Sequence, residues 1–295
     1  MEYESVANIS KKWGLSERSV RNYCAQGRIA NAKLIGKTWH IPTNAEKPER
    51  LYKKQTSPSL LQILREEKSA GRRGGIYHKV QVDLTYNSNH IEGSRLSHDQ
   101  TRYIFETNTI GFTDEAVNVD DVIETANHFR CIDMVIAQAG NPLSEKFIKS
   151  LHATLKSATA DSRKDWFVVG EYKRFPNEVG GEETTAPENV AAEIQTLLAS
   201  YNALPAKTFN DIVAFHVAFE RIHPFQDGNG RVGRLILFKE CLKHNIVPFI
   251  IEDDLKLFYY RGLKEWNREQ GYLLDTCLTA QDRFKKYLEY FRIGY

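Results

Sequence analysis

The segment His223–Arg234 reads HPFQDGNGRVGR and decides how the second half of the chain is interpreted. The preceding residues, Phe209–Ile222, carry apolar side chains at helical spacing, which predicts a buried, rigid helix. Pro224 ends that helix, and the mostly apolar run that starts at Arg231 predicts a second one. The segment is therefore predicted to be a helix–loop–helix junction whose loop ends at a helix N-terminus.

The junction gathers residue types that suit a polyphosphate. Gly228 and Gly230 let the backbone approach a ligand closely, and a helix N-terminus carries partial positive charge that favours an anion. Arg231 and Arg234 are three residues apart, so both can project from one side of the helix and hold two phosphates. Asp227 is the only carboxylate in the loop, and a carboxylate beside phosphates commonly binds Mg²⁺.

His223, Phe225 and Asn229 complete the set. His223 ends the rigid helix, and a histidine has a pKa suited to removing a proton from an incoming hydroxyl. Asn229 can donate and accept within the loop, and Phe225 is expected to turn inward and hold it. Each residue type alone has an ordinary role as a cap, a turn or a surface ion pair. Their joint occurrence favours a nucleotide site.

This constellation resembles the Fic family signature HxFx(D/E)GNGRxxR, with every specified position present. The resemblance covers about residues 80–295 and implies a mostly helical Fic core that transfers AMP from Mg·ATP to a Ser, Thr or Tyr hydroxyl of a protein. It implies His223 as general base and Asp227 as Mg²⁺ ligand. Related Doc-type kinases carry lysine where this chain has Gly230, so the glycine favours AMP transfer. The nucleotide-binding residues that it implies are Gly228, Asn229, Gly230, Arg231, Arg234 and, more distantly, Tyr260.

A second motif, YNSNHIEGSRL at Tyr86–Leu96, lies upstream. Ser88 and Glu92 are four residues apart, so a helix over about 84–95 stacks them on one face, and Gly93 permits the helix to end. By itself this is an ordinary helix end. Beside the first motif it resembles the family's inhibitory sequence (S/T)xxxE(G/N). That resemblance implies that Glu92 pairs with Arg234 in the γ-phosphate position, or else orients a water that removes AMP.

Between these motifs, residues 166–187 are predicted to form strands and turns in an otherwise helical body. The expected strands are Trp166–Val169 and Tyr172–Phe175, with a turn at Gly180-Gly181. The segment resembles the Fic flap, which would hold a target protein as an added strand. A structural hairpin is the alternative. Tyr260 lies where similar relatives line the adenosine pocket, although an aromatic cluster on a helix is commonly core.

The N-terminal residues 5–24 predict two short amphipathic helices that meet at Gly14, with Ser16 as a cap. A glycine turn between such helices is the helix-turn-helix arrangement. Two strands, Ala30–Ile35 and Thr38–Ile41, are predicted next. The pattern resembles the winged helix-turn-helix of MerR- and excisionase-type proteins over about 43 residues. A protein-docking unit is the alternative. The candidates for DNA contact are Arg18, Arg21 and Asn22.

The net charge of +2 conceals an asymmetry between the two ends of the chain. Residues 1–80 carry 16 Lys and Arg against 7 Asp and Glu, whereas the rest is acidic. A basic first module and an acidic body indicate two domains, the first of which suits a polyanion. We predict a winged helix-turn-helix domain at 1–46, a linker with a connecting helix at 47–78, and a mainly α Fic domain at 79–295.

The remaining features of the sequence indicate the compartment and the partners that we expect. The four cysteines lie far apart with no CxxC pair, which predicts isolated thiols in a reducing cytoplasm rather than zinc ligands or disulfides. No signal peptide or membrane span is expected. The expected partners are ATP, Mg²⁺ and a target protein, with DNA and a second copy of the chain left open. The alternatives to an AMP-transferring enzyme are a nucleotide-sensing DNA-binding regulator and an enzyme that also removes AMP.

Overall fold

The computed structural model describes residues 2–36, 38–48, 58–111 and 116–295, and the chain divides into two compact units, Met1–Thr56 and Ser57–Tyr295. Each unit has its own hydrophobic core. The four cysteines are free and buried. Among the described residues, no helix combines the length and the apolar character that crossing a bilayer requires.

In its described residues, the first unit contains two helices and a three-stranded antiparallel sheet of order β1-β3-β2. Ser5 and Ser16 cap the helices by accepting backbone N–H groups, and Gly14 ends α1 with a φ of 62°. The elements are β1 (Tyr3–Ser5), α1 (Val6–Trp13), α2 (Glu17–Ala25), β2 (Lys33–Ile35) and β3 (Thr38–Pro42). The core residues are Val6, Ile9, Trp13, Val20, Cys24, Ile29 and Ile41. The winged helix-turn-helix assignment stays a prediction.

The described part of the second unit is mainly helical, which confirms the predicted fold class. Its first helices are α3 (Leu60–Ser69), α4 (Ile76–Ile91), α5 (His98–Thr107), α6 (Val119–Gln138) and α7 (Glu145–Leu155). They are followed by α8 (Val190–Ala203), α9 (Phe209–Ile222), α10 (Asn229–Lys243), α11 (Lys256–Glu265) and α12 (Gly271–Tyr290). Helix α3, which the sequence analysis places in the linker, packs here against α4 and α6.

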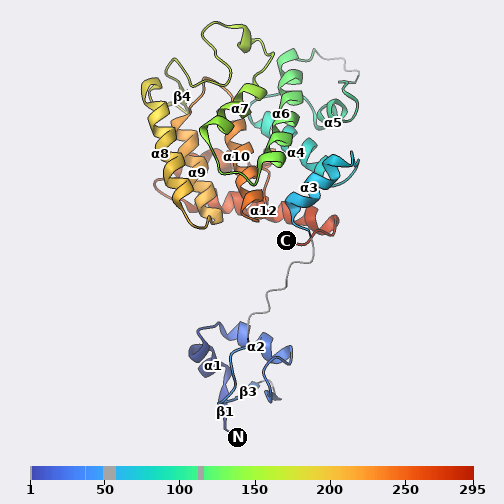
Figure 1. Cartoon of the computed structure of the whole chain (residues 1–295), viewed down its shortest axis with the longest axis vertical. Helices are drawn as coiled ribbons and strands as arrows, with labels where there is room; N and C mark the ends of the chain where they lie inside the picture. Colours follow the sequence, from blue (N-terminus) through green and yellow to red (C-terminus); the bar gives the residue numbers. More distant parts are fainter. Residues whose placement is uncertain (1, 37, 49–57, 112–115) are drawn as a thin grey trace. The chain divides into compact units, whose positions relative to one another are not determined.

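Helix α10 lies at the centre of the second unit and packs against α9, α6, α7 and α4 (Figure 1). It is buried over nearly its whole length, including the charged pair Lys239 and Glu240. The Lys239 ammonium donates to Glu240 at 2.7 Å and to the Asn141 carbonyl at 2.8 Å, and the Tyr201 hydroxyl donates to Glu240 at 3.0 Å. Because these buried charges are satisfied, α10 holds its N-terminus in a fixed place.

Helix α9 delivers the chain to that N-terminus. Thr208 and Asp211 form a capping box that starts it. It ends at His223, which has a left-handed φ of 49°, and α10 begins after Gly228, whose φ is 82°. The predicted helix–loop–helix junction is therefore present between α9 and α10.

The segment between α7 and α8 differs from the prediction. Trp166–Val169 and Tyr172–Phe175 form turns and irregular backbone, and the strands lie further on as β4 (Glu178–Val179) and β5 (Glu182–Glu183). The physical reason is visible at Gly170, whose N–H donates to the His152 ring at 2.8 Å instead of to another strand. Side chains of the helical body take the backbone hydrogen bonds that a longer sheet would need.

Gly170 also packs closely on α7, and this contact can be tested. With a φ of 82°, a Cβ there would lie 2.9 Å from the Ala153 Cβ, whereas Gly180 has a φ of 61° and open space around it. We expect Gly170→Ala to lower the free energy of unfolding by about 1–3 kcal/mol more than Gly180→Ala, because only the first adds a clash to the backbone strain. Urea denaturation of both variants measures the difference, and equal losses would contradict the packing argument.

Candidate active site

The loop between α9 and α10 is held by its own side chains. The Phe225 N–H donates to the Asn229 side-chain oxygen at 2.7 Å, and the Asn229 amide donates back to the Phe225 carbonyl at 2.8 Å. The Phe225 ring is fully buried and stacks on His152 with ring centroids 4.0 Å apart. The His152 Nε2 donates to the Asp227 carbonyl at 3.1 Å. The Asn229 side chain therefore holds the loop in shape, and what it can offer a ligand is its backbone N–H.

The N-terminus of α10 presents donors that suit an anion. Its N-cap residue, Gly228, provides no side-chain cap, so the first N–H groups of the helix lack that partner. Arg231 in the first turn is buried and pairs with Glu124 and, at 3.3 Å, with Asp227. Its Nε is buried without a hydrogen-bond partner. An orphaned donor beside a helix N-terminus indicates a place for a phosphate oxygen.

Arg234 lies one turn further along α10, with only 5% of its side chain exposed. Its guanidinium donates to the Ser88 hydroxyl at 3.0 Å, to the Ser88 carbonyl at 2.8 Å and to the Glu92 carboxylate at 2.7 Å. Burial works against the charged form, but the carboxylate of Glu92 more than offsets this and raises the pKa of Arg234. The structure thus brings together the two motifs that the sequence analysis links only by resemblance.

Glu92 is the residue that follows the last turn of α4, and Gly93 continues with a φ of 98°. Its carboxylate lies directly over Gly230, where an added Cβ would collide with it and approach the Arg234 guanidinium to 3.0 Å. The Tyr260 hydroxyl, on the half-exposed face of α11, donates to the Ile91 carbonyl at 3.3 Å. Tyr260 therefore borders the end of α4 beside Glu92, which is compatible with the predicted adenosine pocket.

His223 faces the site with one ring nitrogen already engaged. Its Nδ1 lies 3.2 Å from the Glu220 carbonyl, to which it can only donate. The lone pair is then on Nε2, the tautomer that a general base needs. Burial lowers the pKa of His223 from its ordinary value, and the nearby charge of Lys173 acts in the same direction. A neutral imidazole at neutral pH follows from this arrangement.

Asp227 has a cationic partner that the sequence did not reveal. The Lys156 ammonium, buried at the end of α7, lies 2.6 Å from Asp227, 2.5 Å from Glu124 and 3.0 Å from Asp161. Burial alone would raise the pKa of Asp227, but the charges of Arg231 and Lys156 outweigh it and lower the pKa to about 2. Nothing in the local pattern around Lys156 indicates this role.

Asp227 is the residue in this site that suits Mg²⁺. Among the described residues, no cluster of three or more His, Cys, Asp or Glu side chains is arranged to hold a metal ion. Asp227, however, is half-exposed and uses a single carboxylate oxygen for Lys156 and Arg231. Mg²⁺ in nucleotide sites is commonly held by one or two carboxylates together with substrate phosphates. Asp227 fits a metal that arrives with a nucleotide, and not one bound by the protein alone.

A buried polar cluster behind Arg234 was also missed by the sequence analysis. The His216 Nε2 and the Tyr259 hydroxyl are 2.6 Å apart, and Gly233 leaves room for His216 and Glu220 against α10. A Glu220 carboxylate oxygen and the other His216 nitrogen are buried without hydrogen-bond partners. Burial raises the pKa of Glu220 to about 8 despite the opposing charge of Arg234. His216 and Glu220 lie in α9, whose apolar periodicity predicts an ordinary core helix. The sequence pattern therefore gives no indication of their polar contacts.

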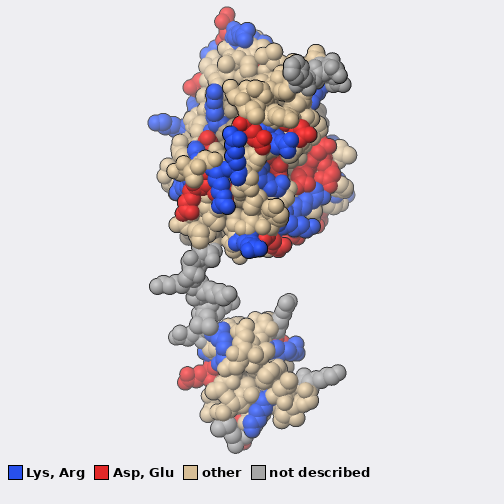
Figure 2. Space-filling view, turned by 90° about the vertical axis from the view of Figure 1, so that its right-hand side faces the viewer, with Lys and Arg blue, Asp and Glu red and all other residues tan. Residues whose placement is uncertain are grey.

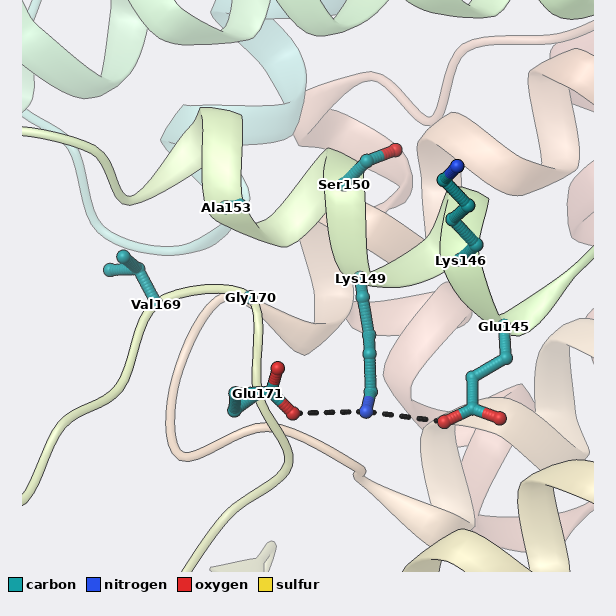
Figure 3. A pocket seen from close by; sticks show the side chains of 8 residues that line it. All are labelled: Glu145, Lys146, Lys149, Ser150, Ala153, Val169, Gly170 and Glu171. Atoms are coloured by element: carbon teal, nitrogen blue, oxygen red, sulfur yellow. Dashed lines mark hydrogen bonds and ion pairs between the residues drawn. The ribbon is translucent and has the colours of Figure 1, made fainter.

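An open pocket of about 530 Å³ lies between α7 and the segment around Gly170 (Figure 3). Lys149 crosses it between Glu145, at 3.2 Å, and Glu171, at 2.9 Å. Gly170 lines the pocket and, through His152, is linked to the Asp227 loop. The central lysine is already paired with two carboxylates.

The DNA-contact candidates belong to the first unit. Arg21 pairs with Glu17 at 2.6 Å on the exposed face of α2, and Asn22 is exposed beside it. The side chain of Arg18 lies outside the described part of the structure. On the visible face of the second unit, Lys and Arg are interspersed with Asp and Glu (Figure 2). Contact with DNA stays a prediction for α2.

Fold and site together define a mainly helical protein in which α10 begins just after His223 and its loop, and in which Glu92 pairs with Arg234. A family model described as Fic/DOC family matches residues 142–240. The protein adenylyltransferase Fic of Drosophila virilis is 28% identical over 212 residues, covering 69% of this chain and 41% of the relative. That of Drosophila persimilis is 27% identical over 223 residues, covering 73% and 41%. The chain spans about two fifths of the length of these curated relatives.

Solved structures show the same fold. A Fic domain containing signaling protein from Bacteroides thetaiotaomicron superposes with a TM-score of 0.62 at 24% identity, over 78% of this chain and 94% of the other. Fic-1 from C. elegans, residues 134–508, superposes with a TM-score of 0.63 at 18% identity, over 79% and 71%. The comparisons support the predicted Fic family domain. The inhibitory and helix-turn-helix assignments stay predictions.

The raised pKa of Glu220 predicts how stability depends on pH. Its ordinary value is 4.5 and its folded value about 8, so the folded state retains the proton that the unfolded state releases. This contribution is complete below pH 4.5 and is lost as pH rises through 8, by an amount on the order of 2–4 kcal/mol. Glu220→Gln should remove that loss, whereas the exposed Glu66→Gln should keep it. Urea denaturation at pH 5, 7 and 8.5 measures it, and parallel slopes for wild type and Glu220→Gln would refute the assignment.

Proposed function

We propose that this protein transfers AMP from Mg·ATP to a Ser, Thr or Tyr hydroxyl of another protein, and that Glu92 holds this activity off. The observation that carries the proposal is the Glu92–Arg234 pair beside the free N-terminus of α10. A carboxylate there occupies a cationic position that suits a terminal phosphate. The names of the similar Drosophila proteins, protein adenylyltransferases, support the same reaction.

The chemistry follows from the arrangement of the loop. The triphosphate lies along the N–H groups of residues 228–231, with Arg234 on its terminal phosphate and the Arg231 Nε as a further donor. The target hydroxyl gives its proton to Nε2 of His223, and its oxygen attacks the α-phosphorus. The bond from that phosphorus to the β-phosphate oxygen breaks, and pyrophosphate leaves. Asp227 would hold Mg²⁺ together with the phosphates, and the ion would supply charge neutralisation to the leaving group.

Glu92 opposes this in two ways. Its carboxylate takes the Arg234 donors that the γ-phosphate requires, and its negative charge repels the polyphosphate. Without that anchor the nucleotide binds weakly or presents its α-phosphate in the wrong direction. Removal of the carboxylate should therefore raise both affinity for ATP and transfer.

Labelling with α-³²P-ATP and Mg²⁺ tests this proposal. Glu92→Gly should incorporate label into itself or into extract proteins about 10-fold or more above wild type, since loss of a paired charge of this kind corresponds to at least 1.4 kcal/mol. Adding His223→Ala to that variant should abolish the label. Glu66→Gly, which removes an exposed glutamate from α3, serves as the matched control and should behave as wild type.

The readout separates the two parts of the proposal. Label in wild type and Glu92→Gly at equal levels would contradict inhibition by Glu92 while leaving transfer intact. Absence of label in both, with ATP binding measured calorimetrically in Glu92→Gly, would contradict transfer. Release of AMP from a pre-labelled target by wild type would identify the removal reaction instead.

A second proposed function, DNA binding by the first unit, is favoured by the two capped helices joined at Gly14 and by the basic charge of residues 1–80. We expect the full chain to bind duplex DNA with an affinity that falls as salt rises, because phosphate contacts release counterions. Arg21→Ala with Asn22→Ala should weaken binding about 10-fold, on the basis of about 1–3 kcal/mol per base contact. Fluorescence anisotropy measures both, and salt-independent or unchanged binding would favour a protein-docking unit.

A further inference from the structure

Lys173 lies in the segment 166–187 and reaches both sides of His223. Its backbone N–H donates to the Pro224 carbonyl at 2.8 Å, and its ammonium donates to the Ile222 carbonyl at 3.3 Å. These are the two peptide carbonyls that flank His223 in sequence. A single residue of a distant segment therefore holds the backbone immediately before and after the candidate base.

The backbone at His223 has a conformation that requires support from its surroundings. His223 has a φ of 49°, a left-handed conformation that is unfavourable for a residue with a Cβ. The conformation ends α9 and starts the loop that leads to α10. Such a conformation persists only where surrounding bonds enforce it, and the two bonds from Lys173 lie at the necessary positions.

The rest of the Lys173 environment ties the same segment together. Its ammonium also donates to the Asn177 side-chain oxygen at 2.7 Å and to the Thr184 hydroxyl at 2.5 Å. The Asn177 amide donates to the Phe225 carbonyl at 3.0 Å. The side chain is 4% exposed, and in the described part of the chain it forms no ion pair with a carboxylate. Three neutral oxygens receive a buried positive charge, an arrangement that is hard to explain by stability alone.

We propose that Lys173 is a positioning residue for His223, which grips the flanking carbonyls and joins the segment 166–187 to the base. The proposal deepens the proposed function and rests on it for its catalytic meaning. By this arrangement, a target strand that docks on the segment lies on backbone that is hydrogen-bonded to the residues on both sides of the base. The same contacts then set both the position of the target hydroxyl and the orientation of the imidazole.

The charge of Lys173 adds an electrostatic consequence. Burial lowers the pKa of His223, and Lys173 lowers it further, which favours the neutral imidazole. Glu92 and Asp227 are the carboxylates that oppose this, together with the hydrogen bond to the Glu220 carbonyl. Burial also lowers the pKa of Lys173 to about 8, so its charge is present at neutral pH and fades above it.

The first test needs no nucleotide and uses the full chain. The His223 ring signal, assigned by its loss in His223→Ala, is titrated by NMR. Lys173→Met should move the midpoint upward by about 0.5–1 pH, because a nearby positive charge is lost. Lys173→Gln should do the same and serves if the methionine variant does not fold. Thr184→Val removes one ammonium partner without touching either carbonyl bond and should leave the midpoint in place.

The second test measures labelling from α-³²P-ATP in the Glu92→Gly background. Lys173→Met should lower the rate at saturating ATP about 10-fold, as expected when a base is misplaced, with the half-saturating ATP concentration changed by less than about 2-fold. The pH profile should move upward with the NMR midpoint, and Lys173→Arg should restore part of the rate. A merely structural role would reduce the folded fraction without moving either curve.

The outcomes distinguish the two proposals. An unmoved His223 midpoint in both neutral variants, or an unchanged labelling rate in Lys173→Met, overturns the positioning role. If Glu92→Gly incorporates no label while the midpoint still moves, the proposed AMP transfer fails and the link between Lys173 and His223 stands.

Discussion

The structure around the candidate site depends on satisfying the buried guanidinium of Arg234. A buried charge that loses its partner costs about 3–5 kcal/mol, so some anion must always lie against it. In this structure the anion is Glu92, with Ser88 supplying a hydroxyl and a carbonyl. A terminal phosphate can replace the carboxylate, because both present oxygens to the same donors. The Glu92 contact, which we propose to be inhibitory, and the proposed substrate contact are thus alternative solutions to one electrostatic requirement.

The other side of the loop follows the same principle with different partners. Lys156 and Arg231 are buried, and Glu124, Asp161 and Asp227 surround them. Asp161 also pairs with Lys164 at 2.7 Å, so three carboxylates lie among three cations. A polyphosphate with its metal can compete for this network through Asp227, whose side chain is the most exposed of the three acids. The buried cations on this side of the loop therefore have carboxylate partners from the protein itself.

The sequence predicted local geometry well and distant partners poorly. The junction of α9 and α10 follows from residues that are neighbours in the chain, namely Pro224, the glycines and two apolar runs. The pairing of Glu92 with Arg234 spans 142 positions and came only from resemblance. The residues next to Lys156 and Glu220 in sequence do not indicate the contacts that these two side chains make, because the surrounding patterns are those of ordinary amphipathic or core helices. The strands expected at 166–175 failed because His152 and Gln226 take backbone hydrogen bonds there.

The way Glu92 is attached bears on how it can be released. It follows the last turn of α4, and Gly93 beyond it has a φ of 98° that a residue with a side chain would rarely adopt. Rotation at this helix end can withdraw the carboxylate from Arg234 without unwinding α4, whose buried side chains anchor it in the core.

A shift from 1:99 to 99:1 between the two arrangements needs about 5.5 kcal/mol of differential binding. A triphosphate gains contacts with Arg234, with the free N–H groups of α10 and with the unpaired Nε of Arg231. These charge-assisted contacts can supply the differential binding free energy. The Ser88 hydroxyl accepts from Nε of Arg234 and the Ser88 carbonyl from Nη2, so both contacts can persist while Glu92 leaves. The retained serine contacts keep the guanidinium oriented during the exchange, so the same arginine can serve first the carboxylate and then the phosphate.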